Sequence, residues 1–147
     1  MLVGAALVLR DTAPGRLPIG ILGDGDFLMG VQALWTAAHE RIPLLAVVAN
    51  NRAYYNDVVN QEKVEHARGR DTSRSLIGQQ IDYPATDLAG LARAQGLRGI
   101  GPITRPADLP GAIRDALAAV RSGVPTVLDV IVEPGYTPAM SAGISGH

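Results

Sequence analysis

Short apolar runs alternate with segments of helical periodicity along most of this chain. Residues 17–22 and 44–49 are apolar runs of strand length, and residues 124–132 form a third run that is rich in β-branched side chains. Apolar side chains at three- and four-residue spacing predict a helix over residues 26–40, with Leu28, Val31, Leu34, Trp35 and Ala38 on its buried face. Further helices are predicted at residues 1–10, 86–95 and 106–121, and a weaker strand at residues 97–103.

Strands that alternate with helices predict an α/β fold, a doubly wound parallel sheet with helices on both faces. We expect one domain over residues 1–135 and a polar tail over residues 136–147. The pattern is interrupted between residues 51 and 83 by a polar segment that is too long for an ordinary connection. This segment is either a lid or wall of a site, or a solvated helix with a loop.

Composition and charge exclude several classes of function. The formal net charge is −1 and the basic residues are scattered, so nucleic acid is not an expected partner. Without cysteine the chain has no disulfide, thiolate nucleophile or Cys-ligated zinc, which fits a cytoplasmic protein. No apolar run is long enough to cross a membrane, and no membrane partner is expected.

Two oxygen-bearing side chains follow the first two predicted strands. Asp24 lies within Gly23-Asp24-Gly25, and Asn51 follows Asn50. Because the carboxyl ends of parallel strands meet at one edge of a sheet, these side chains should emerge side by side. The glycines allow a tight turn whose amides, at a helix N-terminus, favour phosphate. A carboxylate, a carboxamide oxygen and a diphosphate together suit Mg²⁺.

The Gly-Asp-Gly triplet, followed after twenty-four residues by Asn-Asn, resembles the diphosphate-binding motif of thiamine-diphosphate-dependent enzymes. Residues 33–38 and Ile42-Pro43 are also similar to the branch that includes acetolactate synthase and benzoylformate decarboxylase. The resemblance implies that Mg²⁺ is bound by the side chains of Asp24 and Asn51 and by the carbonyl of Ala53. It further implies that the amides of Gly25 and Asp26, and the Tyr54 region, face the phosphates.

The resemblance also implies a reaction. In that family the thiazolium carbanion of the cofactor adds to the carbonyl of a 2-oxo acid and carbon dioxide leaves, so the chain would belong to a decarboxylase or carboligase. A glutamate on a separate pyrimidine-binding domain activates the cofactor, and no segment of this chain resembles that domain. We therefore expect an N-terminally truncated diphosphate domain that is inactive alone, carries no catalytic residue of its own, and joins a homo- or hetero-oligomer. The alternative is a non-catalytic structural or phosphate-binding fragment.

Other interpretations of single residues stay open or are disfavoured. Asn50 either joins the site or stabilises the turn through its own backbone. Trp35 is expected in the core rather than against a cofactor. A nicotinamide site would need a third glycine where Leu28 stands, and the chain has no Gly-Lys-Ser/Thr loop for a nucleoside triphosphate.

Overall fold

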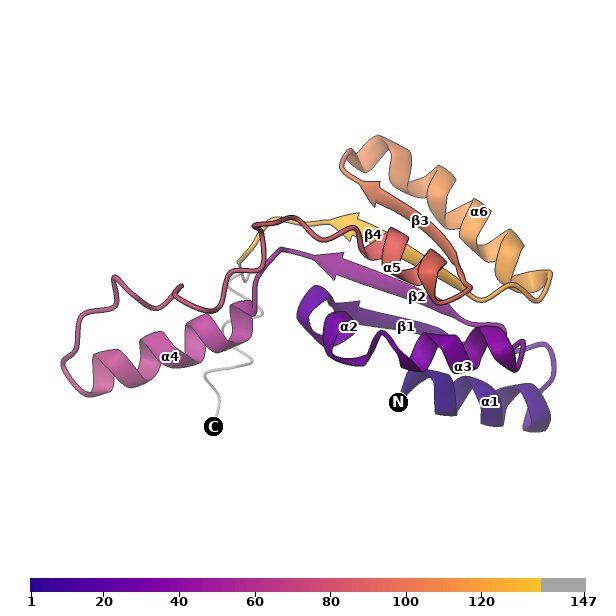
Figure 1. The fold of residues 1–147 in the computed structure, drawn as a ribbon, viewed down its shortest axis with the longest axis horizontal. Helices are drawn as coiled ribbons and strands as arrows, with labels where there is room; N and C mark the ends of the chain where they lie inside the picture. Colours follow the sequence, from indigo (N-terminus) through magenta and orange to yellow (C-terminus); the bar gives the residue numbers. More distant parts are fainter. Residues whose placement is uncertain (136–147) are drawn as a thin grey trace.

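A four-stranded parallel sheet forms the centre of the computed structural model, which describes residues 1–135 (Figure 1). The strand order is β1-β2-β4-β3, so β4 is inserted between two strands that precede it in the chain. The strands are β1 Ile19–Gly23, β2 Leu45–Asn50, β3 Arg98–Ile103 and β4 Thr126–Ile131. The predicted doubly wound α/β architecture is confirmed, and the predicted tail at residues 136–147 lies outside the described residues.

The helices are α1 Leu2–Thr12, α2 Asp24–Gly30, α3 Ala33–His39, α4 Tyr55–Ala67, α5 Leu88–Ala94 and α6 Leu109–Arg121. A short 3₁₀ turn, η1 Pro106–Asp108, precedes α6. The single helix predicted over residues 26–40 is wrong in detail, because α2 begins at Asp24 and a turn at residues 31–32 separates it from α3. The cap of α5 is Asp87 rather than Thr86, because the Asp87 carboxylate accepts the Gly90 N–H at 2.7 Å.

Two apolar clusters cover the two faces of the sheet. One cluster joins α1, α2, α3 and α5 to the sheet through buried residues such as Ala6, Phe27, Ala37 and Leu88. The other packs α6 against the opposite face through Ala112, Ala116 and Val120. Alternate residues of β4 serve the two clusters, Val127 one and Leu128 the other, which is why this central strand reads as a continuous apolar run.

Trp35 does not lie in the core as predicted. Its side chain is 56% exposed and stacks on His39, with ring centroids 4.7 Å apart. The buried positions of α3 are Leu34 and Ala37. The other four predicted residues, Leu28, Val31, Leu34 and Ala38, do pack against the core. At about 100° per residue, Trp35 lies at the margin of the face that Leu34, Ala37 and Ala38 form, so its ring reaches the surface.

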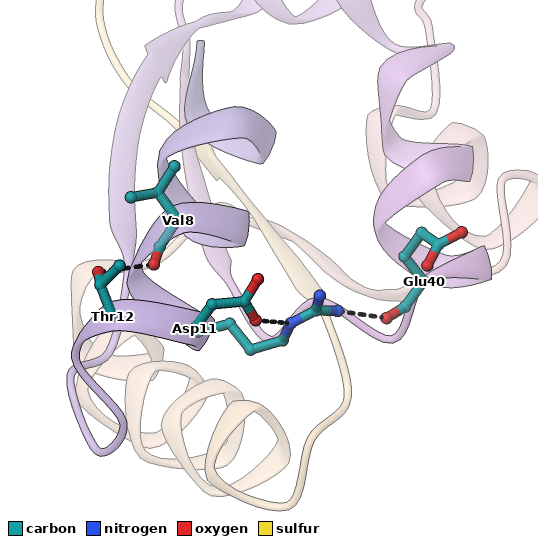
Figure 2. Close-up of polar contacts among 5 residues, drawn as sticks. Val8, Asp11, Thr12 and Glu40 are labelled. Carbon is teal, nitrogen blue, oxygen red and sulfur yellow. Dashed lines mark hydrogen bonds and ion pairs between the residues drawn. The ribbon is translucent and has the colours of Figure 1, made fainter.

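The C-terminal end of α1 is tied to the end of α3 by polar contacts (Figure 2). The Arg10 guanidinium donates to Asp11 at 2.8 Å and to the carbonyl oxygen of Glu40 at 3.0 Å. The Thr12 hydroxyl donates to the carbonyl oxygen of Val8, one turn earlier in α1, at 2.7 Å.

Helix α4 extends away from the sheet in Figure 1, together with the irregular segment that follows it. Val58 is its single buried residue, as in a solvated helix. The segment returns to the sheet edge, where the Tyr54 N–H donates to the Gln79 carbonyl at 2.8 Å and the Ile81 N–H to the Arg52 carbonyl at 2.9 Å. The polar stretch thus contains a solvated helix and also holds the loop after β2.

Strand β1 forms one edge of the sheet and carries apolar side chains that no helix covers. Ile19 is 53% exposed and Ile21 is 78% exposed, whereas α6 covers this face only beside β2, β3 and β4. Among residues 1–135, no helix has the length and apolar character needed to cross a membrane.

Candidate functional site

The register of β1 and β2 brings the two predicted motifs together. Gly23 is paired with Ala49, so Asp24 and the Asn50-Asn51 pair leave adjacent strands at the same level. One cavity of about 550 Å³ lies at this edge. It is lined by all seven residues predicted for the cofactor, which are Gly23, Asp24, Gly25, Asp26, Asn51, Ala53 and Tyr54.

Asp24 is buried at the first turn of α2, with 3% of its surface exposed. Its Oδ2 atom has no hydrogen-bond partner among the described residues. Burial raises the pKa of this carboxyl, and interactions with the backbone amides of Gly25, Arg52 and Ala53 oppose the rise only in part. A buried carboxylate oxygen without a partner is costly unless a ligand satisfies it.

The two asparagines shape the loop after β2 through their own backbone. The Asn50 Oδ1 accepts the Arg52 N–H at 3.2 Å, and the Asn51 Oδ1 accepts the Ala53 N–H at 3.0 Å. Between these contacts Arg52 adopts a φ of 60°, in the left-handed region that is uncommon for residues other than glycine. The turn-stabilising interpretation of Asn50 is therefore confirmed. Asn51 makes the same kind of contact, and its carboxamide oxygen keeps a second lone pair for a ligand.

Gly25 permits a close approach between the two motifs. A Cβ atom at this position would overlap the ring of Tyr54, which packs directly over the backbone of Gly25. The glycine is thus needed for the loop after β2 to fold down on the first turn of α2.

The charges around the cavity favour a cation. Three of its lining residues are carboxylates, Asp24, Asp26 and Asp57, and none is a lysine, arginine or histidine. Within residues 1–135, no group of three or more His, Asp or Glu side chains is arranged to hold a metal ion. The donors present, one orphaned carboxylate oxygen and neutral carbonyl-type oxygens, are hard ligands of the kind that Mg²⁺ takes when phosphate and water complete its shell.

Sequence reasoning missed one buried acid beside this site. Asp129 of β4 is 1% exposed, and its Oδ1 accepts the Asn50 Nδ2–H at 3.0 Å across 79 residues of sequence. An aspartate inside the apolar run of β4 was the available signal, because charged side chains are rarely buried without a partner. Met29, Asn56 and Asp57 also line the cavity and were not predicted for the site. Tyr55, which could be either a site residue or an ordinary boundary residue beside a turn, lines the cavity as well.

Comparisons with known proteins agree on one family. Residues 1–130 match the family described as "Thiamine pyrophosphate enzyme, C-terminal TPP binding domain". Benzoylformate decarboxylase of Pseudomonas aeruginosa is 33% identical over 132 residues, covering 88% of this chain and 23% of that protein. An acetolactate synthase large subunit of Parasynechococcus marenigrum is 28% identical, covering 97% of this chain and 23% of that protein.

A solved structure is also similar in fold. The thiamine diphosphate-dependent 4-hydroxybenzoylformate decarboxylase of Rhodococcus jostii superposes with a TM-score of 0.67 at 28% identity, covering 92% of this chain and 22% of that one. The chain therefore spans less than a quarter of the length of the relatives that it matches.

Proposed function

We infer, from the premise that this chain belongs to the thiamine pyrophosphate enzyme family and forms its C-terminal TPP-binding domain, that the cavity at β1 and β2 binds thiamine diphosphate through Mg²⁺. In this proposal the metal ligands are Asp24, Asn51 and the carbonyl of Ala53. The amides of Gly25 and Asp26, and Tyr54, face the diphosphate.

The observation that carries this proposal is the charge of the cavity. Asp24, Asp26 and Asp57 line it and no basic side chain does. A diphosphate alone would be repelled by these carboxylates, whereas a divalent cation between them is attracted to both. Mg²⁺ and the diphosphate should therefore bind together, each weakly without the other.

The residues of this chain would bind and orient the cofactor rather than move protons. The orphaned oxygen of Asp24 would gain a cationic partner, and the first-turn amides of α2 would donate to phosphate oxygens. When bound, the cofactor supplies a carbanion that adds to a carbonyl and permits decarboxylation. The chain's contribution would be to hold the diphosphate end of the cofactor in place.

The activity of the whole assembly is a further part of the proposal. We assign it to a 2-oxo acid decarboxylase or carboligase in which a pyrimidine-binding domain or subunit completes the site and an oligomer forms. The similarity to benzoylformate decarboxylase and acetolactate synthase supports this assignment. By itself the chain should not turn over 2-oxo acids. The competing proposal, a structural or phosphate-binding piece without the cofactor, predicts no Mg²⁺-dependent binding.

Isothermal titration calorimetry with thiamine diphosphate tests the proposal. The chain should bind in the presence of Mg²⁺ and show no heat when EDTA replaces the metal. The variant Asp24→Asn, which keeps the size of the side chain, should lose binding by ~100-fold or more, as expected when a charged metal ligand is removed. The control Asp115→Asn alters an exposed aspartate of α6 and should bind as the unmodified chain does. Binding that is equal with and without Mg²⁺, or no heat at millimolar ligand, would contradict the proposal.

A further inference from the structure

We propose that Asp129, on the central strand β4, is a positioning residue for the metal-binding loop after β2. This inference rests on the proposed function and deepens it, because it names a residue that controls the metal site without touching it. The juxtaposition that carries it is a chain of hydrogen bonds across two strand ends. This hydrogen-bond path runs from the Asp129 carboxylate to the Asn50 side chain, and from there to the Arg52 amide.

The first link is a buried, charge-assisted hydrogen bond. Asn50 Nδ2 donates to Asp129 Oδ1 at 3.0 Å, and both side chains are buried. Hydrogen bonds to ionised groups inside a protein are stronger and more directional than those between neutral groups. Asp129 therefore determines the orientation of the Asn50 carboxamide, because the Nδ2 side of the amide is held by the carboxylate and the Oδ1 side must point away from it.

The second link carries that orientation to the loop. The outward Asn50 Oδ1 accepts the Arg52 N–H at 3.2 Å, while the Arg52 carbonyl accepts the Ile81 N–H at 2.9 Å. These two contacts, together with the Asp24 carboxylate beside the Arg52 amide, support Arg52 at its φ of 60°, which is uncommon for residues other than glycine. The residues on either side of Arg52 are Asn51 and Ala53, both proposed metal ligands. A change in this turn would redirect both oxygens.

The position of Asp129 separates it from the ligand. Asp129 and Asn50 line a different cavity of about 220 Å³, which they share with Asp87 and Thr86, and neither residue lines the cavity of about 550 Å³. Asp24 borders both cavities. Asp129 thus lies outside the cavity of about 550 Å³, and its hydrogen-bonded route to the loop after β2 passes through Asn50.

The variants test whether that path exists. Asp129→Val removes the acceptor and introduces a β-branched side chain of similar size, which suits a strand. Asp129→Asn keeps an oxygen acceptor for Asn50 and serves as the conservative rescue. Asn50→Ala breaks the path at its middle, and remains informative if Asp129→Val does not fold. Val120→Ala is the matched control, because it removes buried apolar volume from α6 without touching the path.

Two measurements separate positioning from a general loss of stability. The first is the Mg²⁺ concentration at half-saturation with thiamine diphosphate, determined by calorimetry and referred to the folded fraction from circular dichroism. The second is the hydrogen-exchange protection of the Arg52 amide by NMR without ligand. Loss of a hydrogen-bond partner that orients the groups binding a metal typically weakens metal binding by ~10- to 100-fold. We expect a shift of this size in Mg²⁺ affinity for Asp129→Val and for Asn50→Ala. The combined variant should be no weaker than the weaker single variant, because both act on one path.

The expected pattern is that Asp129→Asn and Val120→Ala keep both the Mg²⁺ affinity and the protection of Arg52, whereas Asp129→Val loses both. Equal Mg²⁺ affinity in the unmodified chain and in Asp129→Val, at equal folded fraction, would overturn this inference and leave the proposed function intact. Weakening in Val120→Ala as large as in Asp129→Val, or fold-changes that multiply in the combined variant, would also overturn it. Failure of the unmodified chain to bind Mg²⁺ with thiamine diphosphate would instead remove the proposed function, and this inference with it.

Discussion

Gly25 should be the position where a single methyl group damages the candidate site most directly. A Cβ at Gly25 would meet three atoms of the Tyr54 ring, and it would overlap the two nearest of them. The ring has to swing away, or the loop after β2 has to lift from α2. Overpacking of this kind costs about 1–3 kcal/mol, whereas replacing a helical glycine with alanine otherwise gains about 0.5–1 kcal/mol.

Gly30, at the other end of the same helix, supplies the matched control. A Cβ there would meet no atom within 4 Å, so Gly30→Ala should stabilise the fold by about 0.5–1 kcal/mol. The two alanine variants should therefore differ in free energy of unfolding by about 1–3 kcal/mol, the cost of the overlap alone. Urea unfolding followed by circular dichroism measures this difference. Gly25→Ala should also weaken binding of Mg²⁺ and thiamine diphosphate, because displacement of Tyr54 alters the cavity wall. If Gly25→Ala proves as stable as Gly30→Ala and binds equally well, the packing of Tyr54 over Gly25 does not exist in solution.

Two further outcomes follow from the packing and the buried charges. Gly99→Ala should destabilise the fold by about 3 kcal/mol or more, because its Cβ would overlap the backbone carbonyl of Ala89 in α5, which cannot rotate away. The control Gly4→Ala has open space around the new Cβ and should not destabilise the fold. A comparison of the melting temperatures of the two variants tests this prediction. Burial raises the pKa of both Asp24 and Asp129 above the ordinary value of 3.8, so the folded chain holds these protons more tightly than the unfolded chain. The contribution of these two carboxyls to stability is complete below pH 3.8 and is lost as the pH rises through their raised pKa values. Over that pH interval, Asp24→Asn should therefore gain stability relative to the unmodified chain. Urea unfolding at a series of pH values measures this gain. A difference between the two chains that does not change with pH would refute the burial of that charge.

Much of the fold and most of the site could be predicted because the relevant patterns are local. Strand β4 lies within its predicted apolar run, whereas β1 and β2 overlap theirs and extend one residue beyond the C-terminal end. No end of these three strands differs from the prediction by more than two residues. The site prediction relied on a rule of topology, that neighbouring parallel strands end at one edge, and the observed register of β1 and β2 satisfies it. The binding of Mg²⁺ and cofactor by these residues stays a prediction.

The errors arose where a neighbouring element decides the outcome. Trp35 has the spacing of a core residue, yet it lies at the margin of the buried face of α3 and stacks on His39 at the surface. The predicted N-cap of α5 was Thr86, whereas the observed N-cap is Asp87. Both side chains can cap a helix, and the backbone that enters the helix selects one of the two.

The amino-acid sequence alone indicates most of the strands and helices, and it places an aspartate and an asparagine at the ends of two of the strands. Hydrophobic periodicity and turn chemistry act over a few residues, so they can be recognised directly in the amino-acid sequence. The packing of the whole fold places β4 between β2 and β3, and it therefore brings Asp129 into contact with Asn50, 79 residues away in the sequence. It likewise decided that Tyr54 packs over Gly25. These contacts depend on how distant segments pack, a result of burying apolar surface across the whole chain that no local pattern encodes.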